Sequence, residues 1–205
     1  MGKNRESIFR MAAAALAALF IGLGVASVSQ ASVVMPLRTQ GSLIVDSAGK
    51  EVVLQGVNWF GFETDAHAPH GLWARDYKDM LIQIRSQGFN TIRLPFSIEA
   101  LESSTTSGID YGGGRNAELA GKTPQQVMDI IIAEAERQGL MILLDNHSLA
   151  DDSFMSPLWY GVGGYSENDW VNAWKALSSR YAKEANVIGA DLKNEPHGEA
   201  TWGTG

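Results

Sequence analysis

The residues best suited to chemistry in this 205-residue sequence are polar side chains that lie next to short apolar runs. Asn194 and Glu195 come just after one such run, and Asp145 and His147 come at the end of another. Arg93 lies inside a third run. Polar groups in such places are costly to desolvate unless they are paired. We therefore expect these side chains to meet at one site.

A carboxyl group beside an amide suggests acid–base catalysis on a sugar substrate. Glycoside hydrolysis needs one carboxyl group with a raised pKa to protonate the leaving oxygen, and a neighbouring amide can bind a sugar hydroxyl. Glu195 and Asn194 are candidates for these two roles. Simpler alternatives are a surface carboxylate for Glu195, a structural ion pair for Arg93 and a hydrogen-bonded core residue for His147.

Aromatic residues outside the predicted helices favour a sugar-binding groove, because their flat apolar rings with polar rims match the faces of pyranose rings. Each ring taken alone could equally be structural. Those in predicted loops or at strand ends are Trp59, Trp73, Trp159, Tyr160 and Trp202. Trp170 and Trp174 have helical spacing and are expected in the core.

Composition excludes several other kinds of site. The chain has no cysteine, so it can form no disulfide, thiolate zinc site or cysteine nucleophile. With 23 acidic against 16 basic residues it offers no drive toward nucleic acid or anionic lipid. His67 and His70 have the spacing of a metal pair, but they fall in a predicted loop and no second ligand pair is visible. We expect no metal and no cofactor.

Two alternating periodicities predict the elements that position these residues. Residues 43–46 and 51–55 flank a Gly-containing turn and predict a hairpin. Strands are predicted at 53–60, 91–94, 140–145 and 187–192, and helices at 77–87, 123–138 and 166–183. Pro95 is expected to close the second strand, and Thr123, Pro124 and Gln126 to begin a helix with a capping box.

Strands that alternate with helices predict an α/β fold with a parallel sheet and right-handed crossovers. Carboxyl ends of parallel strands converge on one rim, where ligands bind. Periodicity does not decide between an open sheet and a closed barrel. The first strand leads into 56–62, which has no glycine-rich turn opening into a helix, so a phosphate-binding fold is not expected.

The first 31 residues have the pattern of a signal peptide. Lys3, Arg5 and Arg10 precede an uncharged run at 11–28, and small residues at 29 and 31 predict cleavage after Ala31. The alternative is an uncleaved anchor, since 18 apolar residues approach the length that spans a bilayer. We expect residues 32–205 to be the mature, secreted part, with no membrane partner after cleavage.

Five blocks in order resemble secreted bacterial endo-1,4-β-glucanases (cellulases) of glycoside hydrolase family 5. They are residues 56–64 (GVNWFGFET), 70–75 (HGLWAR), 91–95 (TIRLP), 144–147 (LDNH) and 191–197 (DLKNEPH). The resemblance spans nearly all of 40–205. It implies a (β/α)8 barrel and a retaining mechanism on β-1,4-glucan, with a monomeric full-length protein.

The resemblance also implies roles for individual residues. Glu195 would be the acid/base, Asn194 would bind the sugar 2-hydroxyl, Arg93 would orient the nucleophile and His147 would bind substrate at subsite −1. The residues expected to line the groove are Trp59, His70, Trp159 and Tyr160. Residues 148–150 depart from the family, whose members often have Pro and Asp after this histidine.

The family places its nucleophilic glutamate at the end of the seventh strand, whereas this chain predicts four strands. We therefore expect residues 32–205 to be the N-terminal portion of a catalytic domain, holding about the first four βα units and lacking the nucleophile. The alternative is a non-catalytic half barrel that binds glucan or associates with itself.

Overall fold

The computed structural model describes residues 33–151, 156–201 and 203. The predicted signal peptide at 1–31 lies outside these described residues. Within the described part of the chain, no helix has both the length and the apolar character needed to cross a membrane.

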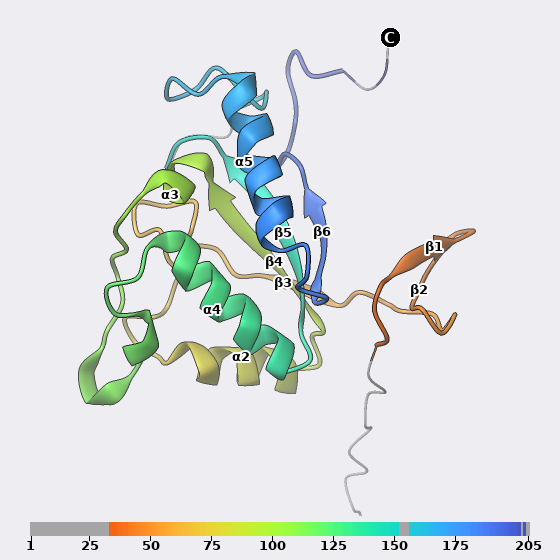
Figure 1. The fold of residues 1–205 in the computed structure, drawn as a ribbon, viewed down its shortest axis with the longest axis horizontal. Helices are drawn as coiled ribbons and strands as arrows, with labels where there is room; N and C mark the ends of the chain where they lie inside the picture. Colours follow the sequence, from red (N-terminus) through yellow and green to blue (C-terminus); the bar gives the residue numbers. More distant parts are fainter. Residues whose placement is uncertain (1–32, 152–155, 202, 204–205) are drawn as a thin grey trace, which may run out of the picture. The chain divides into compact units, whose positions relative to one another are not determined.

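Four parallel strands form the central sheet, in the order β3-β4-β5-β6. They are β3 (Gly56–Asn58), β4 (Thr91–Ser97), β5 (Met141–Ser148) and β6 (Val187–Asp191). Figure 1 shows the arrowheads of β4, β5 and β6 pointing toward the same end of the sheet. This arrangement confirms the predicted α/β class, and it brings the carboxyl ends of the strands to one rim.

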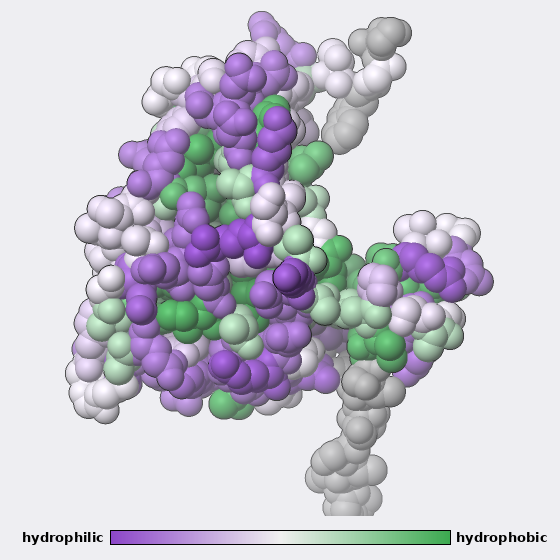
Figure 2. Space-filling model, viewed as in Figure 1, coloured by the Kyte–Doolittle hydropathy of each residue, from purple (hydrophilic) through white to green (hydrophobic). Residues whose placement is uncertain are grey.

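The helices that follow the strands pack on the sheet. They are α2 (Tyr77–Ser86), α3 (Ile98–Glu102), α4 (Pro124–Arg137) and α5 (Glu167–Arg180), and 3-10 turns occupy Gly112–Gly114 and Ala117–Leu119. In Figure 1, α2, α4 and α5 lie over the same face of the sheet. Their solvent side is mostly hydrophilic, with apolar side chains visible between the helices in Figure 2.

Local signals fix where the helices begin. Thr123 accepts a hydrogen bond from the Gln126 backbone, and the Gln126 side chain accepts one from the Thr123 backbone, so the predicted capping box is confirmed. Ser166 and Asp169 form an equivalent box at the start of α5. These contacts satisfy backbone N–H groups that have no partner within the helix.

The core lies between the helices and the sheet. Ile92, Leu94 and Phe96 alternate along β4 and are fully buried, in one cluster with α2, α4 and α5. Trp174 of α5 belongs to this cluster, and its ring meets Phe96 edge-on at 5.5 Å between centroids. Trp170 packs against the same cluster, so the predicted core positions of both tryptophans are confirmed.

Two strands run further than predicted. β4 does not end at Pro95 but pairs with β5 as far as Ser97. Pairing with β3 has already stopped at Arg93, so the missing N–H of the proline interrupts no bond on that side. β5 likewise continues past the predicted end at Asp145 to Ser148, which makes His147 a strand residue too. The pairing of these polar side chains, described below, offsets the cost of placing them in a strand.

The edge strand and the hairpin are shorter than predicted. Only Gly56–Asn58 of the run at 53–60 forms β3, and Val53 is 63% exposed. In the hairpin, β1 (Arg38–Gln40) pairs with β2 (Leu43–Val45), whereas the predicted strand at 51–55 contributes a single bridge from Glu51 to Val45. Asp46 closes the turn between them, accepting hydrogen bonds from Ala48 and Lys50, and the Lys50 backbone bond lowers its pKa.

Candidate active site

Arg93 is the centre of a polar cluster at the carboxyl end of the sheet. Its guanidinium contacts Asp145 of β5 at 2.9 Å and Asp191 of β6 at 2.7 Å. The same side chain donates to Asn194 Oδ1 at 3.0 Å and to Asn58 Oδ1 at 3.3 Å. One planar cation therefore joins residues from all four strands or their ends, as the fork of N–H donors in arginine allows.

Asp145 holds two of the predicted site residues in place. Its carboxylate is completely buried, and Oδ2 binds both Arg93 and His147 Nδ1, the latter at 2.8 Å. Among the described residues, Asp145 Oδ1 has no hydrogen-bond partner. A buried carboxylate needs such pairing, because desolvation disfavours its charge. The ion pair therefore fixes Arg93 and the His147 ring together.

Asn194 connects this cluster to the predicted acid. Besides accepting from Arg93, its amide nitrogen lies 3.5 Å from His147 Nε2. Its backbone N–H donates to the Asn146 carbonyl at 3.0 Å, which ties the segment just after β6 to β5. The structure thus brings Arg93, His147 and Asn194 together, three of the residues singled out from the sequence.

Glu195 follows the buried Asn194 directly and is itself exposed. Its backbone has φ 45°, in the left-handed region that non-glycine residues seldom adopt outside functional sites and turns. The Glu195 carbonyl accepts from His197 Nδ1 at 2.7 Å. A strained turn therefore presents this carboxylate to solvent next to the cluster.

Lys193 is a buried cation that the sequence analysis did not single out. Its ammonium donates to the Asn194 carbonyl at 2.5 Å, on the peptide that joins Asn194 to Glu195. Burial lowers the pKa of Lys193, and the charges of Asp145, Asp191 and Glu195 oppose that shift. All three carboxylates therefore act on this ammonium group.

The aromatic residues predicted to line the groove divide between core and surface. Trp59 is only 5% exposed and belongs to the hydrophobic core, where its indole N–H donates to the His70 carbonyl at 2.9 Å. Trp59 therefore holds the backbone of His70 through this hydrogen bond. His70 is exposed, stacked on Phe60 at 4.3 Å and edge-on to Trp73 at 4.1 Å.

Trp159 and Tyr160 lie together in the segment between β5 and α5. Their rings are 5.7 Å apart in an edge-on arrangement, and Trp159 also lies 6.1 Å from Trp170 of α5. The Trp159 indole donates to Glu167 at 3.0 Å, while Tyr160 is exposed. This pair forms a second aromatic surface, separate in sequence from that of His70.

The two loop histidines do not share a ligand site. His67 is paired with Asp151, whereas His70 is stacked between aromatic rings. No cluster of three or more His, Asp or Glu side chains suited to a metal ion occurs within the described residues.

Asp191 and Phe60 are the site residues that sequence reasoning missed. Asp191 falls within the predicted strand at 187–192. In β6 it pairs in register with Asp145 and lies on the same side of the strand as Gly189. The period-two alternation of side chains along a strand was therefore the available sequence signal for Asp191. Phe60 falls at the end of the predicted buried strand, whereas the structure leaves it 45% exposed and stacked on His70.

Comparison with known proteins identifies relatives of this arrangement. Residues 45–204 match the family model described as cellulase (glycosyl hydrolase family 5). An endoglucanase of Paenibacillus polymyxa is 43% identical over 202 residues, covering 98% of this chain and 50% of that protein. The major extracellular endoglucanase of Xanthomonas campestris pv. campestris is 50% identical over 163 residues, covering 79% of this chain and 33% of that protein.

Solved structures agree with these sequence matches. The catalytic domain of the Xanthomonas endoglucanase superposes with a TM-score of 0.76 at 48% identity, over 83% of this chain and 48% of that domain. A cellotetraose complex of an endocellulase from Pyrococcus horikoshii gives 0.72 at 42% identity, over 82% of this chain and 45% of that chain. The chain therefore spans about half the length of these solved relatives.

The four parallel strands and their outer helices are thus part of a (β/α)8 barrel, as the sequence predicted. The family model covers most of the chain, and the blocks that carried the resemblance include Asn58, Arg93, Asp145, His147 and Asn194 of the polar cluster just described. This chain belongs to glycosyl hydrolase family 5.

Proposed function

We propose that this chain is the N-terminal portion of an endo-1,4-β-glucanase and supplies its acid/base, Glu195. The observation that carries the proposal is the Arg93 cluster. It fixes Asn194 between Arg93 and His147, immediately before an exposed carboxylate on a strained turn. Relatives named endoglucanases support the same reaction.

Glu195 would donate its proton to the glycosidic oxygen as the bond from that oxygen to the anomeric carbon breaks. A carboxylate would form a bond to the anomeric carbon on the opposite face. Water would then displace it, with Glu195 accepting the water proton. The Asn194 amide would hold the neighbouring hydroxyl, and Arg93 would keep the nucleophile charged and aligned.

We infer that the nucleophile comes from outside this chain. A retaining pair lies roughly 5 to 5.5 Å apart. Among the described residues, the other carboxylates that act on Lys193 together with Glu195 are Asp145 and Asp191, and Arg93 binds both of them. Asp145 is in addition completely buried, so it cannot reach an anomeric carbon. We therefore expect the 205-residue chain alone to be inactive.

The exposed rings of His70 and Tyr160 would each bind a sugar face, one on each of the two aromatic surfaces described above. Trp159 lies beside Tyr160 on the second surface. A β-1,4-glucan is the proposed substrate, in keeping with the cellotetraose bound to the Pyrococcus relative. We also propose that residues 1–31 direct secretion and are removed, and that the completed enzyme is a monomer.

The test supplies the half of the barrel that this chain lacks. Residues 33–205 are joined to the remaining half of the Xanthomonas catalytic domain, and hydrolysis of carboxymethyl cellulose, mannan and xylan is measured. We expect activity on carboxymethyl cellulose that Glu195→Gln removes. A folded, monomeric chimera that hydrolyses none of the three would reject the proposal.

A non-catalytic glucan-binding module is the second candidate. The aromatic surface made by Phe60, His70 and Trp73 favours it, because stacking on sugars needs no second carboxylate. Affinity electrophoresis of the 205-residue chain in a gel containing glucan separates the two. Retardation that Trp73→Ala abolishes, with an inactive chimera, would favour the module.

A further inference from the structure

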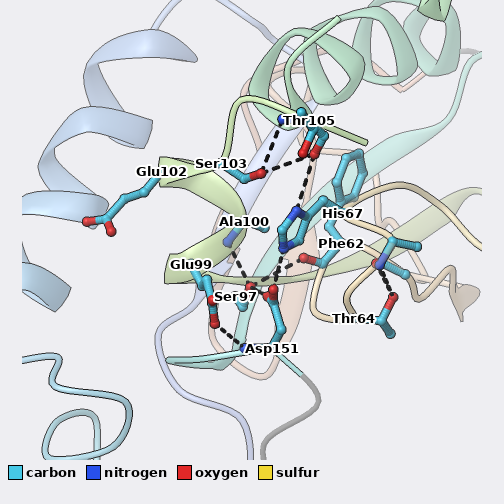
Figure 3. A network of polar contacts seen from close by, with 12 residues as sticks. Phe62, Thr64, His67, Ser97, Glu99, Ala100, Glu102, Ser103, Thr105 and Asp151 are labelled. Atoms are coloured by element: carbon cyan, nitrogen blue, oxygen red, sulfur yellow. Dashed lines mark hydrogen bonds and ion pairs between the residues drawn. The ribbon is translucent and has the colours of Figure 1, made fainter. Parts of the chain in front are cut away.

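A second polar cluster at the carboxyl ends of the strands is centred on Asp151, in the segment that follows β5. Figure 3 shows this carboxylate between Ser97 and His67. Ser97 Oγ donates to Asp151 Oδ1 at 2.5 Å, and His67 Nε2 contacts Oδ2. The Asp151 backbone N–H donates to Glu99 of α3 at 2.9 Å. Asp151 thus binds a residue of the β3–α2 loop, the last residue of β4 and a residue of α3.

The order of contacts excludes a serine-hydrolase triad here. In such a triad the histidine lies between the serine and the carboxylate. Here the carboxylate lies between Ser97 and His67. Ser97 is also fully buried and caps α3 by accepting from the Ala100 N–H at 2.9 Å. The cluster is therefore suited to holding loops in place and not to nucleophilic attack.

The backbone around His67 is shaped to aim its ring at Asp151. His67 has φ 49°, a left-handed conformation that costs a non-glycine residue conformational energy. Its N–H donates to the Thr64 carbonyl at 3.0 Å, and its Nδ1 lies 3.3 Å from the Thr105 carbonyl. Both ring nitrogens are engaged, as Figure 3 shows, and the side chains of His67 and Asp151 are only 12% and 14% exposed.

We propose that His67 and Asp151 form a clamp that sets the spacing of the β3–α2 and β5–α5 loops and so positions His70 and His147. His70 lies three residues after His67 in one loop, and His147 lies four residues before Asp151 in the other. Ser97 anchors the clamp to the end of β4. The part of this proposal that concerns sugar binding rests on the proposed function. The part that concerns the connection between the two loops does not.

Amide hydrogen exchange of the 205-residue chain tests the tie itself. His67→Phe keeps an aromatic ring but cannot bond to Asp151, whereas His67→Gln retains an N–H donor. We expect His67→Phe to raise exchange about tenfold at 61–70 and 147–151, because a hydrogen bond to a charged group is lost. His67→Gln should restore most of the protection. Equal exchange in all three proteins, or no protection of these loops in the unsubstituted chain, would overturn the clamp.

Asp129→Asn is the matched control. Asp129 of α4 accepts from Arg180 Nε at 2.7 Å and from the Tyr181 hydroxyl at 3.0 Å, so it also ties two elements together through a charged group. Its loss should raise exchange in α4 and α5 and leave 61–70 unchanged. A loop response to Asp129→Asn equal to that of His67→Phe would show general loosening and would also overturn the clamp.

Kinetics in the completed barrel test the consequence for sugar binding. We expect His67→Phe to raise KM for cellotetraose about tenfold with kcat within about twofold, since misplaced binding groups weaken substrate and transition state alike. His67→Gln should bring KM back to within about threefold. Unchanged KM in His67→Phe overturns the positioning role. A completed barrel without glucanase activity rejects the proposed function, while the exchange experiment still decides the tie between the loops.

Discussion

Arg93 and Asp145 lie on adjacent strands two residues out of register, and the Nη1 and Oδ2 atoms of their side chains are 2.9 Å apart. That same oxygen accepts the His147 contact at 2.8 Å. A single buried atom therefore orients a guanidinium and an imidazole that the sequence marked as separate site residues. Rigid support of this kind is what a binding site needs from the residues behind it.

Asp145→Asn should destabilise the chain by about 3 kcal/mol, because removing one charge of a buried ion pair leaves its partner uncompensated. Urea unfolding followed by circular dichroism measures the loss. Asp191→Asn is the control: this carboxylate is only half-buried and Arg93 keeps its buried partner, so about 1 kcal/mol is expected. Equal losses in the two variants would contradict the central place given to Asp145.

Glu195→Gln in the completed barrel should lower kcat on unactivated glucan by about 10²–10⁴-fold, the usual contribution of a positioned acid. Aryl cellobiosides with good leaving groups should lose less, since their departure needs no proton. Initial rates on both substrates give the comparison. Equal losses would remove Glu195 from the acid role, and an inverted product anomer seen by NMR would exclude the retaining mechanism.

The starts of α2, α4 and α5 could be predicted from the sequence because their causes are local. Thr123 and Gln126 bond to each other across three residues, so the start of α4 was correct to the residue. The carboxyl ends of the strands could not be predicted, because long-range pairing sets them. β4 passes through Pro95, a local breaker, since β5 remains its partner. β5 reaches His147 because Asp145, paired with Arg93 of β4, holds the His147 ring.

Candidate site residues divide in the same way. Polar types inside or just after apolar runs identified Arg93, His147, Asn194 and Glu195. Asn194 contacts both Arg93 and His147, and these two share the Asp145 carboxylate. Trp59 is buried in the core, and the sequence could not show this because aromatic residues at strand ends fit either a groove or a core, and only packing decides. The Asp151 cluster had no signal at all, since Ser97, His67 and Asp151 share no spacing in the sequence.

The stability contributed at position 193 should depend on pH. Burial lowers the pKa of Lys193 below its ordinary value of 10.5, so the unfolded chain binds more protons than the folded chain between the two pKa values. Stability at this residue is therefore fully present above pH 10.5 and is lost as pH falls through the folded pKa. The free energy of unfolding, relative to Lys193→Met, should rise from pH 7 toward pH 10.5. A flat or falling difference would mean that the ammonium is not desolvated.

Self-association of the 205-residue chain should proceed through the sheet edges. β3 and β6 are the outer strands of the described sheet, and each lies beside an apolar side chain that is mostly exposed, Val53 at 63% and Leu192 at 54%. Open edges with apolar neighbours recruit further strands, and a lysine at such an edge opposes pairing. Size-exclusion chromatography with light scattering should therefore show oligomers that Val53→Lys combined with Leu192→Lys shifts to monomer. Ile82→Lys, at a comparably exposed apolar residue on α2, should leave the oligomers unchanged. If Ile82→Lys is as effective as the edge pair, general solubility and not edge pairing governs the association, and a monomeric unsubstituted chain would show that the open edges are tolerated.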